Sequence, residues 1–124
     1  MKPTENFSIR KRIKSFYYAF HGLKIVILKE HNFRIHLLAA VVAVAAGLFF
    51  NISSPEWMAI VLIITLVLTL EIVNSALEKL ADFVSPEKNN AIKTIKDMAA
   101  AAVLLSAIAA LIIAAIIFIP KMNF

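Results

Sequence analysis

Five polar residues between positions 71 and 82 have the types and the spacing for carboxylate and amide chemistry on one side of a helix. They stand in an otherwise apolar segment and are Glu71, Asn74, Ser75, Glu78 and Asp82. At about 100° of rotation per residue, all of them fall within about 100° of arc, and Glu71 and Glu78 lie roughly 10 Å apart along the axis. The segment therefore predicts one helix face that carries several carboxylates.

The apolar surroundings of this polar face favour a functional role. A charged side chain inside a bilayer costs several kcal/mol, so such residues line a protein interior or a wet cavity and usually mark a site. The alternative is a solvated face, which requires the helix to leave the bilayer near residue 75. That alternative fits Asp82 best and Glu71 least, because Glu71 is the deepest of the carboxylates.

Other charged residues could complete a site for phosphoryl transfer. Glu30 and Glu78 could hold Mg²⁺, which typically takes one or two protein carboxylates and fills its shell with phosphates and water. Glu71 could accept the proton of an alcohol that arrives through the lipid, since burial favours proton uptake by a carboxylate. Lys96 and a basic N-terminal helix could neutralise phosphates. These parts suit phosphoryl transfer to a lipid hydroxyl.

Simpler explanations exist for several of these residues. Glu30 and Arg34 have the spacing of an i,i+4 ion pair, and Lys96 and Asp97 could be charges that extend from a helix end to the membrane surface. The histidines lack the spacing of paired zinc ligands and are interpreted as interfacial polar residues: His21, His31 and His36.

The composition indicates an all-α membrane protein with a single domain over residues 1–124. Of the 124 residues, 61% are hydrophobic, whereas soluble domains are nearer half apolar. Charges are absent from residues 37–55, 57–70 and 98–120. Since a spanning helix needs about 20 mostly apolar residues, we predict three spans, at about residues 32–50, 55–82 and 91–119.

The segment from residue 8 to residue 30 predicts an amphipathic helix that lies on the membrane surface. Apolar residues recur there at steps of four and three, which builds one stripe. The stripe consists of Ile9, Ile13, Phe16, Phe20, Leu23 and Ile27.

The distribution of basic residues predicts the orientation in the membrane. Eight of the 13 Lys and Arg residues precede residue 35, four lie between 79 and 96, and none lies in the turn 51–56. The positive-inside rule then places the N-terminus and the loop at 83–92 in the cytoplasm. We expect a multi-pass membrane protein with its N-terminus in the cytoplasm.

Several function classes are disfavoured by what the sequence lacks. There is no cysteine, so thiol catalysis and Cys-ligated metal sites are excluded. No GxxxxGK[ST] or GxGxxG motif is present, and any nucleotide site is therefore of another type. The formal net charge of +5 flanks hydrophobic spans, which indicates lipid headgroups rather than nucleic acid as the partner.

Three sequence segments resemble the bacterial integral-membrane diacylglycerol kinase and undecaprenol kinase family. They are EIVNSALEKLAD (71–82), KEHNFRIHLLAA (29–40) and IKDMAAAAVLL (95–105). Two further segments, SPEWMAI (54–60) and IIFIPK (116–121), are similar to the undecaprenol kinase branch. The resemblance covers nearly the whole chain.

This resemblance implies a fold, an assembly and site residues. The fold is an N-terminal surface helix with three transmembrane helices, assembled as a homotrimer that uses ATP and Mg²⁺. Glu71 resembles the catalytic base, and Glu30 and Glu78 resemble the metal ligands. The residues that resemble contacts to the nucleotide are Lys11, Tyr18, Asn74, Glu87, Lys96 and Asp97.

The sequence departs from the family pattern at a few positions. Lys11 stands where Arg is common and lacks the bidentate fork of a guanidinium. His36 stands where the diacylglycerol branch has a carboxylate, and this choice suits the undecaprenol branch. Ala100 and Ala101 stand where Ser or Gly can occur, so we expect no hydroxyl contact to the lipid there.

The resulting hypothesis is an ATP-dependent kinase that phosphorylates a membrane lipid alcohol, undecaprenol or diacylglycerol, with undecaprenol slightly favoured. A second hypothesis is a non-catalytic small membrane subunit whose polar face only joins helices. A third is a proton or cation pathway, because intramembrane carboxylates also mark transport.

Overall fold

The computed structural model describes residues 6–122, and this part of the chain is almost entirely helical. The helices are α1 (Ile9–Lys29), α2 (His31–Phe49), α3 (Ser54–Val84) and α4 (Asn90–Phe118), followed by a 3₁₀ turn, η1 (Ile119–Lys121). The predicted helical segments agree with these bounds within a few residues. The all-α fold is therefore confirmed for the described residues.

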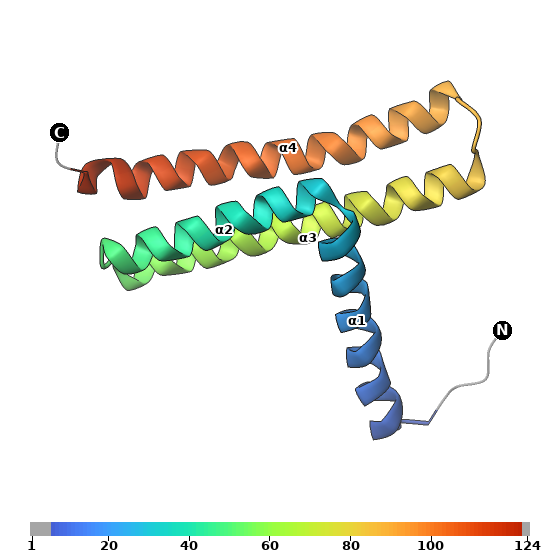
Figure 1. Ribbon diagram of the computed structural model, residues 1–124, viewed down its shortest axis with the longest axis horizontal. Coiled ribbons are helices and arrows are strands. Elements are labelled where there is room, and N and C mark those ends of the chain that lie inside the picture. Colours follow the sequence, from blue (N-terminus) through green and yellow to red (C-terminus); the bar gives the residue numbers. More distant parts are fainter. Residues whose placement is uncertain (1–5, 123–124) are drawn as a thin grey trace.

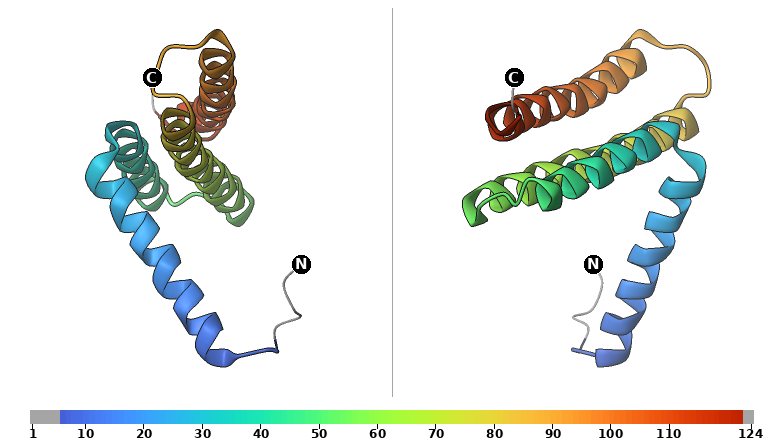
Figure 2. Two further views of the ribbon diagram at one scale, coloured as in Figure 1. Left: turned by 90° about the vertical axis from the view of Figure 1, so that its right-hand side faces the viewer. Right: turned by 60° about the vertical axis from the view of Figure 1, so that its left-hand side comes forward.

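Three of the helices form a bundle, and α1 leaves it at a steep angle (Figure 1). Helices α2, α3 and α4 run alongside one another, and α3 contacts both of its neighbours. The views in Figure 2 show that α1 meets the bundle only at its C-terminal end, where it contacts both α2 and α3. Val26, near the C-terminal end of α1, is its one buried residue.

The break between α1 and α2 consists of a single residue, Glu30. Its backbone is extended, with φ −109° and ψ 111°, and it serves both as the C-cap of α1 and as the N-cap of α2. The backbone N–H of Glu30 still donates to the carbonyl of Val26 at 3.0 Å. A residue with a carboxylate therefore stands at the point where the chain changes direction.

Side-chain caps stabilise the N-terminal ends of both α3 and α4. Ser53 and Glu56 form a capping box at the start of α3, in which the Ser53 backbone N–H donates to Glu56 Oε1 at 2.9 Å. Asn89 caps α4 by accepting a hydrogen bond from the backbone N–H of Ala91 at 2.8 Å. These bonds satisfy N–H groups that helix starts leave without partners.

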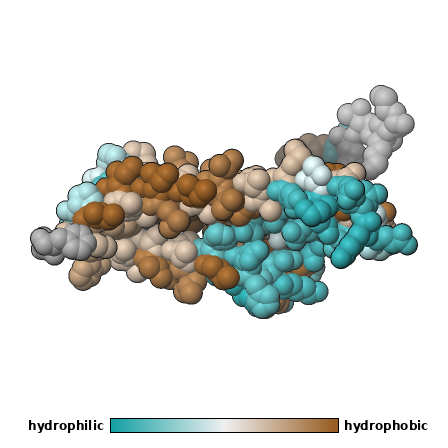
Figure 3. Space-filling model, turned by 90° about the horizontal axis from the view of Figure 1, so that it is seen from above, coloured by the Kyte–Doolittle hydropathy of each residue, from teal (hydrophilic) through white to brown (hydrophobic). Residues whose placement is uncertain are grey.

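All three bundle helices are long and apolar enough to cross a membrane: His31–Phe49, Ser54–Val84 and the helical segment Asn90–Lys121. The three predicted spans are thus confirmed as spanning candidates. Figure 3 shows hydrophobic residues over most of the bundle and hydrophilic residues gathered toward one end. The exposed apolar surface of the bundle suits a lipid environment better than water.

The end of the bundle that carries the α2–α3 turn, here called the turn end, holds the main apolar core. Its buried residues are Ile52, Ile60, Ile117 and Phe118. Trp57 packs so closely on Gly47 that an added Cβ at residue 47 would lie 2.7 Å from the indole ring. Lys121 donates to Glu56 at 2.8 Å and joins the end of α4 to the start of α3. The opposite end, here called the loop end, carries the α3–α4 loop and the α1–α2 junction.

Candidate active site

Carboxylates from two elements come together at the loop end. Glu71 and Glu78 lie on α3, and Glu30 lies at the α1–α2 junction. Both Glu30 and Glu78 are close enough to interact electrostatically with Glu71. We call these three residues the carboxylate cluster. The structure thus unites the predicted base with the predicted metal ligands.

Glu71 is buried and has a histidine partner on the neighbouring helix. It is 3% exposed, and its Oε1 lies 3.1 Å from Nε2 of His36 on α2. Among the described residues, His36 is the side chain that pairs with this carboxylate. The sequence interpretation of His36 as an interfacial residue missed this contact. The signal was there, since His36 is the last polar side chain before the charge-free tract 37–55.

The contacts of Glu30 differ from the i,i+4 ion pair considered above. Glu30 Oε1 lies 3.7 Å from Nζ of Lys79 on α3. Arg34 instead donates to the carbonyl of Leu28 at 3.2 Å and lies 2.7 Å from His31 Nδ1. The extended backbone at Glu30 explains the difference, because the residue lies outside the helical register that i,i+4 pairing needs.

The carboxylate cluster fits a cation that takes few protein ligands. Within residues 6–122, no group of three or more His, Cys, Asp or Glu side chains has the geometry of a metal site. Mg²⁺ usually binds one or two carboxylates and completes its shell with water and phosphate oxygens. Glu30 and Glu78 could therefore hold such an ion only if water and phosphate oxygens supplied the rest of its shell.

The predicted polar face of α3 changes from buried to exposed along its length. Glu71, Asn74 and Ser75 are buried, Glu78 is half-buried and Asp82 is exposed. Asn74 Oδ1 is the one buried side-chain polar atom without a hydrogen-bond partner in the described part of the chain. The polar face therefore points into the protein at Glu71, and the solvated alternative holds only for Asp82.

A polar pocket of about 440 Å³ lies at the α3–α4 loop. Lys96 on α4 donates to Asp82 on α3, and both side chains line the pocket with Glu87. We call it the loop pocket, and its remaining lining residues are Ser85, Pro86, Lys88, Asn89, Asn90, Ile92 and Lys93. Asp97 does not line it and pairs with Lys93 at 2.7 Å. Two of the predicted nucleotide contacts, Glu87 and Lys96, are thus brought together.

The structure does not bring Lys11 and Tyr18 to the rest of the site. Both lie in the N-terminal part of α1, which projects away from the bundle (Figure 1). Tyr18 is 64% exposed. Any contact between these residues and a nucleotide at the loop end of the same chain needs a different position of α1.

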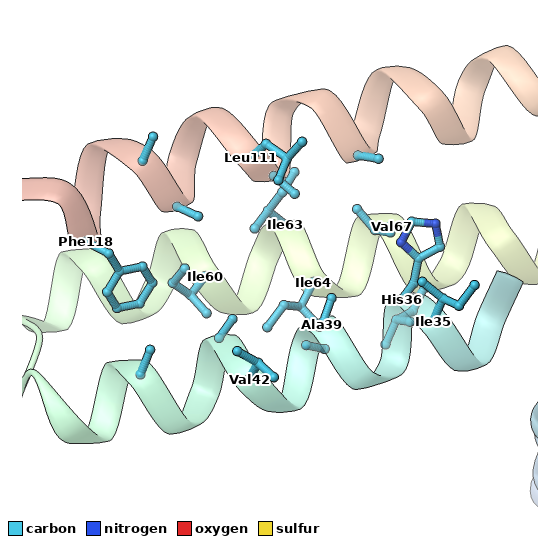
Figure 4. A pocket seen from close by; sticks show the side chains of 18 of the residues that line it. Ile35, His36, Ala39, Val42, Ile60, Ile63, Ile64, Val67, Leu111 and Phe118 are labelled. Carbon is cyan, nitrogen blue, oxygen red and sulfur yellow. The ribbon is translucent and has the colours of Figure 1, made fainter.

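An apolar groove of about 630 Å³ runs along α2, α3 and α4 (Figure 4). Small side chains line much of it, including Ala43, Ala110 and Ala114, and Phe118 lies toward the turn end. His36 is its one polar lining side chain. The groove therefore connects the hydrocarbon-facing part of the bundle with the histidine that contacts Glu71.

Comparisons with known proteins agree with this arrangement. A sequence model of the family described as prokaryotic diacylglycerol kinase matches residues 17–118. The undecaprenol kinase of Bacillus subtilis (strain 168) is 34% identical over 114 residues, which cover 92% of this chain and 93% of that protein. The diacylglycerol kinase of Synechocystis sp. is 35% identical over 109 residues, covering 87% of this chain and 62% of that protein.

The diacylglycerol kinase of Escherichia coli (strain K12) is 31% identical over 100 residues, covering 81% of this chain and 82% of that protein. The match to the family model contains the whole carboxylate cluster and the loop pocket. The chain belongs to the prokaryotic diacylglycerol kinase family of lipid kinases.

Proposed function

We propose that this chain transfers the γ-phosphoryl group of ATP to the hydroxyl of a membrane lipid alcohol at the cytoplasmic face of the bacterial inner membrane. The observation that carries the proposal is the position of Glu71. Its carboxylate is 3% exposed and contacts His36, which lines the apolar groove. A buried proton acceptor at the polar end of an apolar groove is what phosphorylation of a lipid alcohol requires.

In the proposed reaction, Glu71 is the general base. It takes the proton of the lipid hydroxyl while the hydroxyl oxygen forms a bond to the γ-phosphorus. The bond between the γ-phosphorus and the β,γ-bridging oxygen breaks, and ADP leaves with the bonding electron pair. Glu71 then releases its proton to water, which restores the carboxylate for the next turnover.

Glu30 and Glu78 are the proposed ligands of Mg²⁺, which would neutralise charge on the triphosphate. Both interact electrostatically with Glu71, so a magnesium ion on them would bring the phosphates near the base. The proposed nucleotide contacts at the loop end are Asn74, Glu87, Lys96 and Asp97. In support of this role, Lys96 and Glu87 line the loop pocket, and Asn74 Oδ1 lacks a donor within the described chain.

A homotrimer is the proposed assembly. Lys11 and Tyr18, the remaining proposed nucleotide contacts, lie on the part of α1 that projects from the bundle. One chain contributes three helices long enough to span a membrane among its described residues, and Glu30 and Glu78 at the loop end are only half-buried. A site completed by α1 of a neighbouring subunit accounts for both features.

The proposed acceptor is undecaprenol, with diacylglycerol as the other candidate. The relative named undecaprenol kinase matches 92% of this chain and 93% of its own length. The apolar groove would hold the hydrocarbon part of the acceptor, and its alanine-rich wall leaves room for a methyl-branched chain.

The test is transfer of labelled γ-phosphate from ATP to undecaprenol and to diacylglycerol, side by side in detergent micelles. Glu71→Gln is expected to lower kcat by about 100-fold or more, the usual contribution of a general base. Glu56→Gln is the matched control, because Glu56 lies on the same helix at the turn end and contacts Ser53 and Lys121. Wild-type turnover in a folded Glu71→Gln protein would exclude Glu71 as the base.

A further inference from the structure

We propose that His36 is a positioning residue for Glu71, and this inference rests on the proposed function. In the proposed arrangement, the imidazole holds one oxygen of the carboxylate and leaves the other oxygen to receive the proton of the acceptor. His36 thereby acts through Glu71 rather than on the phosphates. His36 lacks the spacing of paired metal ligands, and its contact with Glu71 depends on the packing of α2 against α3.

The geometry of the pair supports this role. His36 Nε2 lies 3.1 Å from Glu71 Oε1, within the range of a hydrogen bond from nitrogen to oxygen. The side chain of Glu71 is 4% exposed, and that of His36 is 25% exposed. The imidazole thus covers a carboxylate that has almost no contact with solvent.

In the pair of His36 and Glu71, His36 is the residue that faces the apolar groove. His36 lines the apolar groove, whereas Glu71 is not among the lining residues. Figure 4 shows the ring beside Val67 of α3. An acceptor that lies in the groove therefore reaches the imidazole at the same point as it approaches the base. A substitution of His36 should therefore alter the orientation of the Glu71 carboxylate first.

The chemistry of the two groups determines which nitrogen carries the hydrogen. An ionised carboxylate only accepts hydrogen bonds, so Nε2 of His36 must be the donor. The other charged groups that interact with Glu71 are Glu30 and Glu78. Since Lys79 pairs with Glu30, His36 is the donor that fixes the rotation of the Glu71 carboxylate.

Two substitutions separate positioning from packing. His36→Leu removes the donor and keeps most of the volume, whereas His36→Gln keeps an N–H group at nearly the same distance from the backbone. We expect His36→Leu to lower kcat by about tenfold to 100-fold with KM for ATP unchanged, consistent with lost orientation of a reacting group. We expect His36→Gln to retain kcat within about threefold. His21→Leu, on the exposed face of α1, is the matched control.

Three kinetic outcomes would overturn the proposal. They are wild-type kcat in His36→Leu, equal loss in both variants at unchanged thermal stability, and a loss in His36→Leu that appears in KM for ATP alone. A second measurement does not depend on activity or on the folding of a variant. Nitrogen NMR of the histidine rings in micelles should show a hydrogen on Nε2 of His36 that exchanges slowly, in contrast to His21.

This second measurement separates the inference from the proposed function. A His36 ring without a hydrogen on Nε2, or one that averages between tautomers as an exposed ring does, would exclude the positioning role even in an active kinase. Absence of phosphate transfer by the wild-type protein to either lipid would instead refute the proposed function. The NMR result would still decide whether the imidazole holds Glu71.

Discussion

Asn74 combines burial with an unsatisfied acceptor. Its Oδ1 is enclosed by protein and receives no hydrogen bond within the described residues. Leaving such a group without a donor costs about 1–3 kcal/mol. The cost is tolerable if the missing donor arrives from a bound nucleotide or from another subunit, which links this residue to function rather than to the stability of a single chain.

Asn74→Leu is expected to separate stability from activity. The substitution removes the unsatisfied oxygen at similar volume, so it should not lower the thermal unfolding temperature of the nucleotide-free protein and should raise its stability by up to about 3 kcal/mol. Phosphate transfer should fall, with the larger effect on KM for ATP. Thermal unfolding in micelles checks the expected stability, and steady-state kinetics check the expected KM for ATP. A destabilised variant with normal kinetics would show that Asn74 is structural.

In the proposed mechanism, Lys79 would compete with the magnesium ion for Glu30. Its ammonium group lies 3.7 Å from the Glu30 carboxylate and its side chain is 58% exposed, so the pair adds less than about 1 kcal/mol to stability. Lys79→Met should therefore leave the fold intact and lower the Mg²⁺ concentration for half-maximal activity by about twofold to fivefold. Titration of activity with Mg²⁺ is the measurement. A higher Mg²⁺ requirement would mean that Lys79 itself contacts the phosphates.

The contacts between residues were less predictable from the sequence than the burial of single residues. Helical periodicity correctly predicts that Glu71 faces inward, because 100° per residue fixes which side chains share a face. Periodicity does not give the rotation of one helix about its axis relative to another. The contacts Glu71–His36, Glu30–Lys79 and Asp82–Lys96 each join two helices or a helix and a junction, and they therefore required the structure.

At the scale of the helices, the close approach of α2 and α3 at the turn end depends on Gly47. A Cβ at this position would lie 2.7 Å from the ring of Trp57. Gly47→Ala should therefore cost about 1–3 kcal/mol through overpacking. Gly22→Ala is the matched control, since nothing lies within 4 Å of a Cβ there, and it should gain about 0.5–1 kcal/mol of helix stability.

Thermal unfolding of the two alanine variants in micelles measures this difference. Combining Gly47→Ala with Trp57→Phe should recover most of the loss, because the smaller ring makes room for the added methyl group. If Gly47→Ala and Gly22→Ala behaved alike, the contact with Trp57 would not limit the distance between α2 and α3.

The apolar groove makes a prediction about the acceptor. Ala43 on α2 lines the groove, whereas Ala45 on the same helix does not. Ala43→Phe should fill part of the groove and raise KM for the lipid by about fivefold or more, in keeping with about 1–3 kcal/mol for overpacking. KM for ATP should stay unchanged. Ala45→Phe should leave both KM values unchanged. Equal effects of the two substitutions on lipid KM would place the acceptor elsewhere.

The positions of the helices were accessible from the sequence because their causes are local. Long charge-free tracts predict the spans, and capping residues such as Ser53 and Asn89 mark the helix starts. The angle between α1 and the bundle is not local, because it depends on the backbone of one residue, Glu30. The groove between α2 and α4 is likewise a property of packing and has no sequence pattern of its own.

At the scale of the whole molecule, the N-terminal part of α1 projects away from the loop end, and the proposed trimer therefore predicts that subunits share residues at each site. A trimer of Glu71→Gln chains and a trimer of Lys11→Ala chains should each be inactive. If each site combines the carboxylate cluster of one chain with α1 of another, random mixing of the two variants should restore about a quarter of the wild-type rate.

Reconstitution from a denatured equimolar mixture of the two variants, followed by phosphate transfer to the lipid, tests this sharing. Each variant reconstituted alone in the same way is the control and should remain inactive. Recovery of no activity from the mixed sample, with trimers present, would mean that each site is built within one chain and that α1 must move to reach it.

The single extended residue between α1 and α2 has a mechanical consequence. The φ and ψ angles of Glu30 set the direction of α1, because helical hydrogen bonding is continuous on both sides of this residue. The same residue carries a carboxylate that faces Lys79. In the proposed mechanism, a cation bound to this carboxylate would therefore also fix the direction in which α1 leaves the bundle.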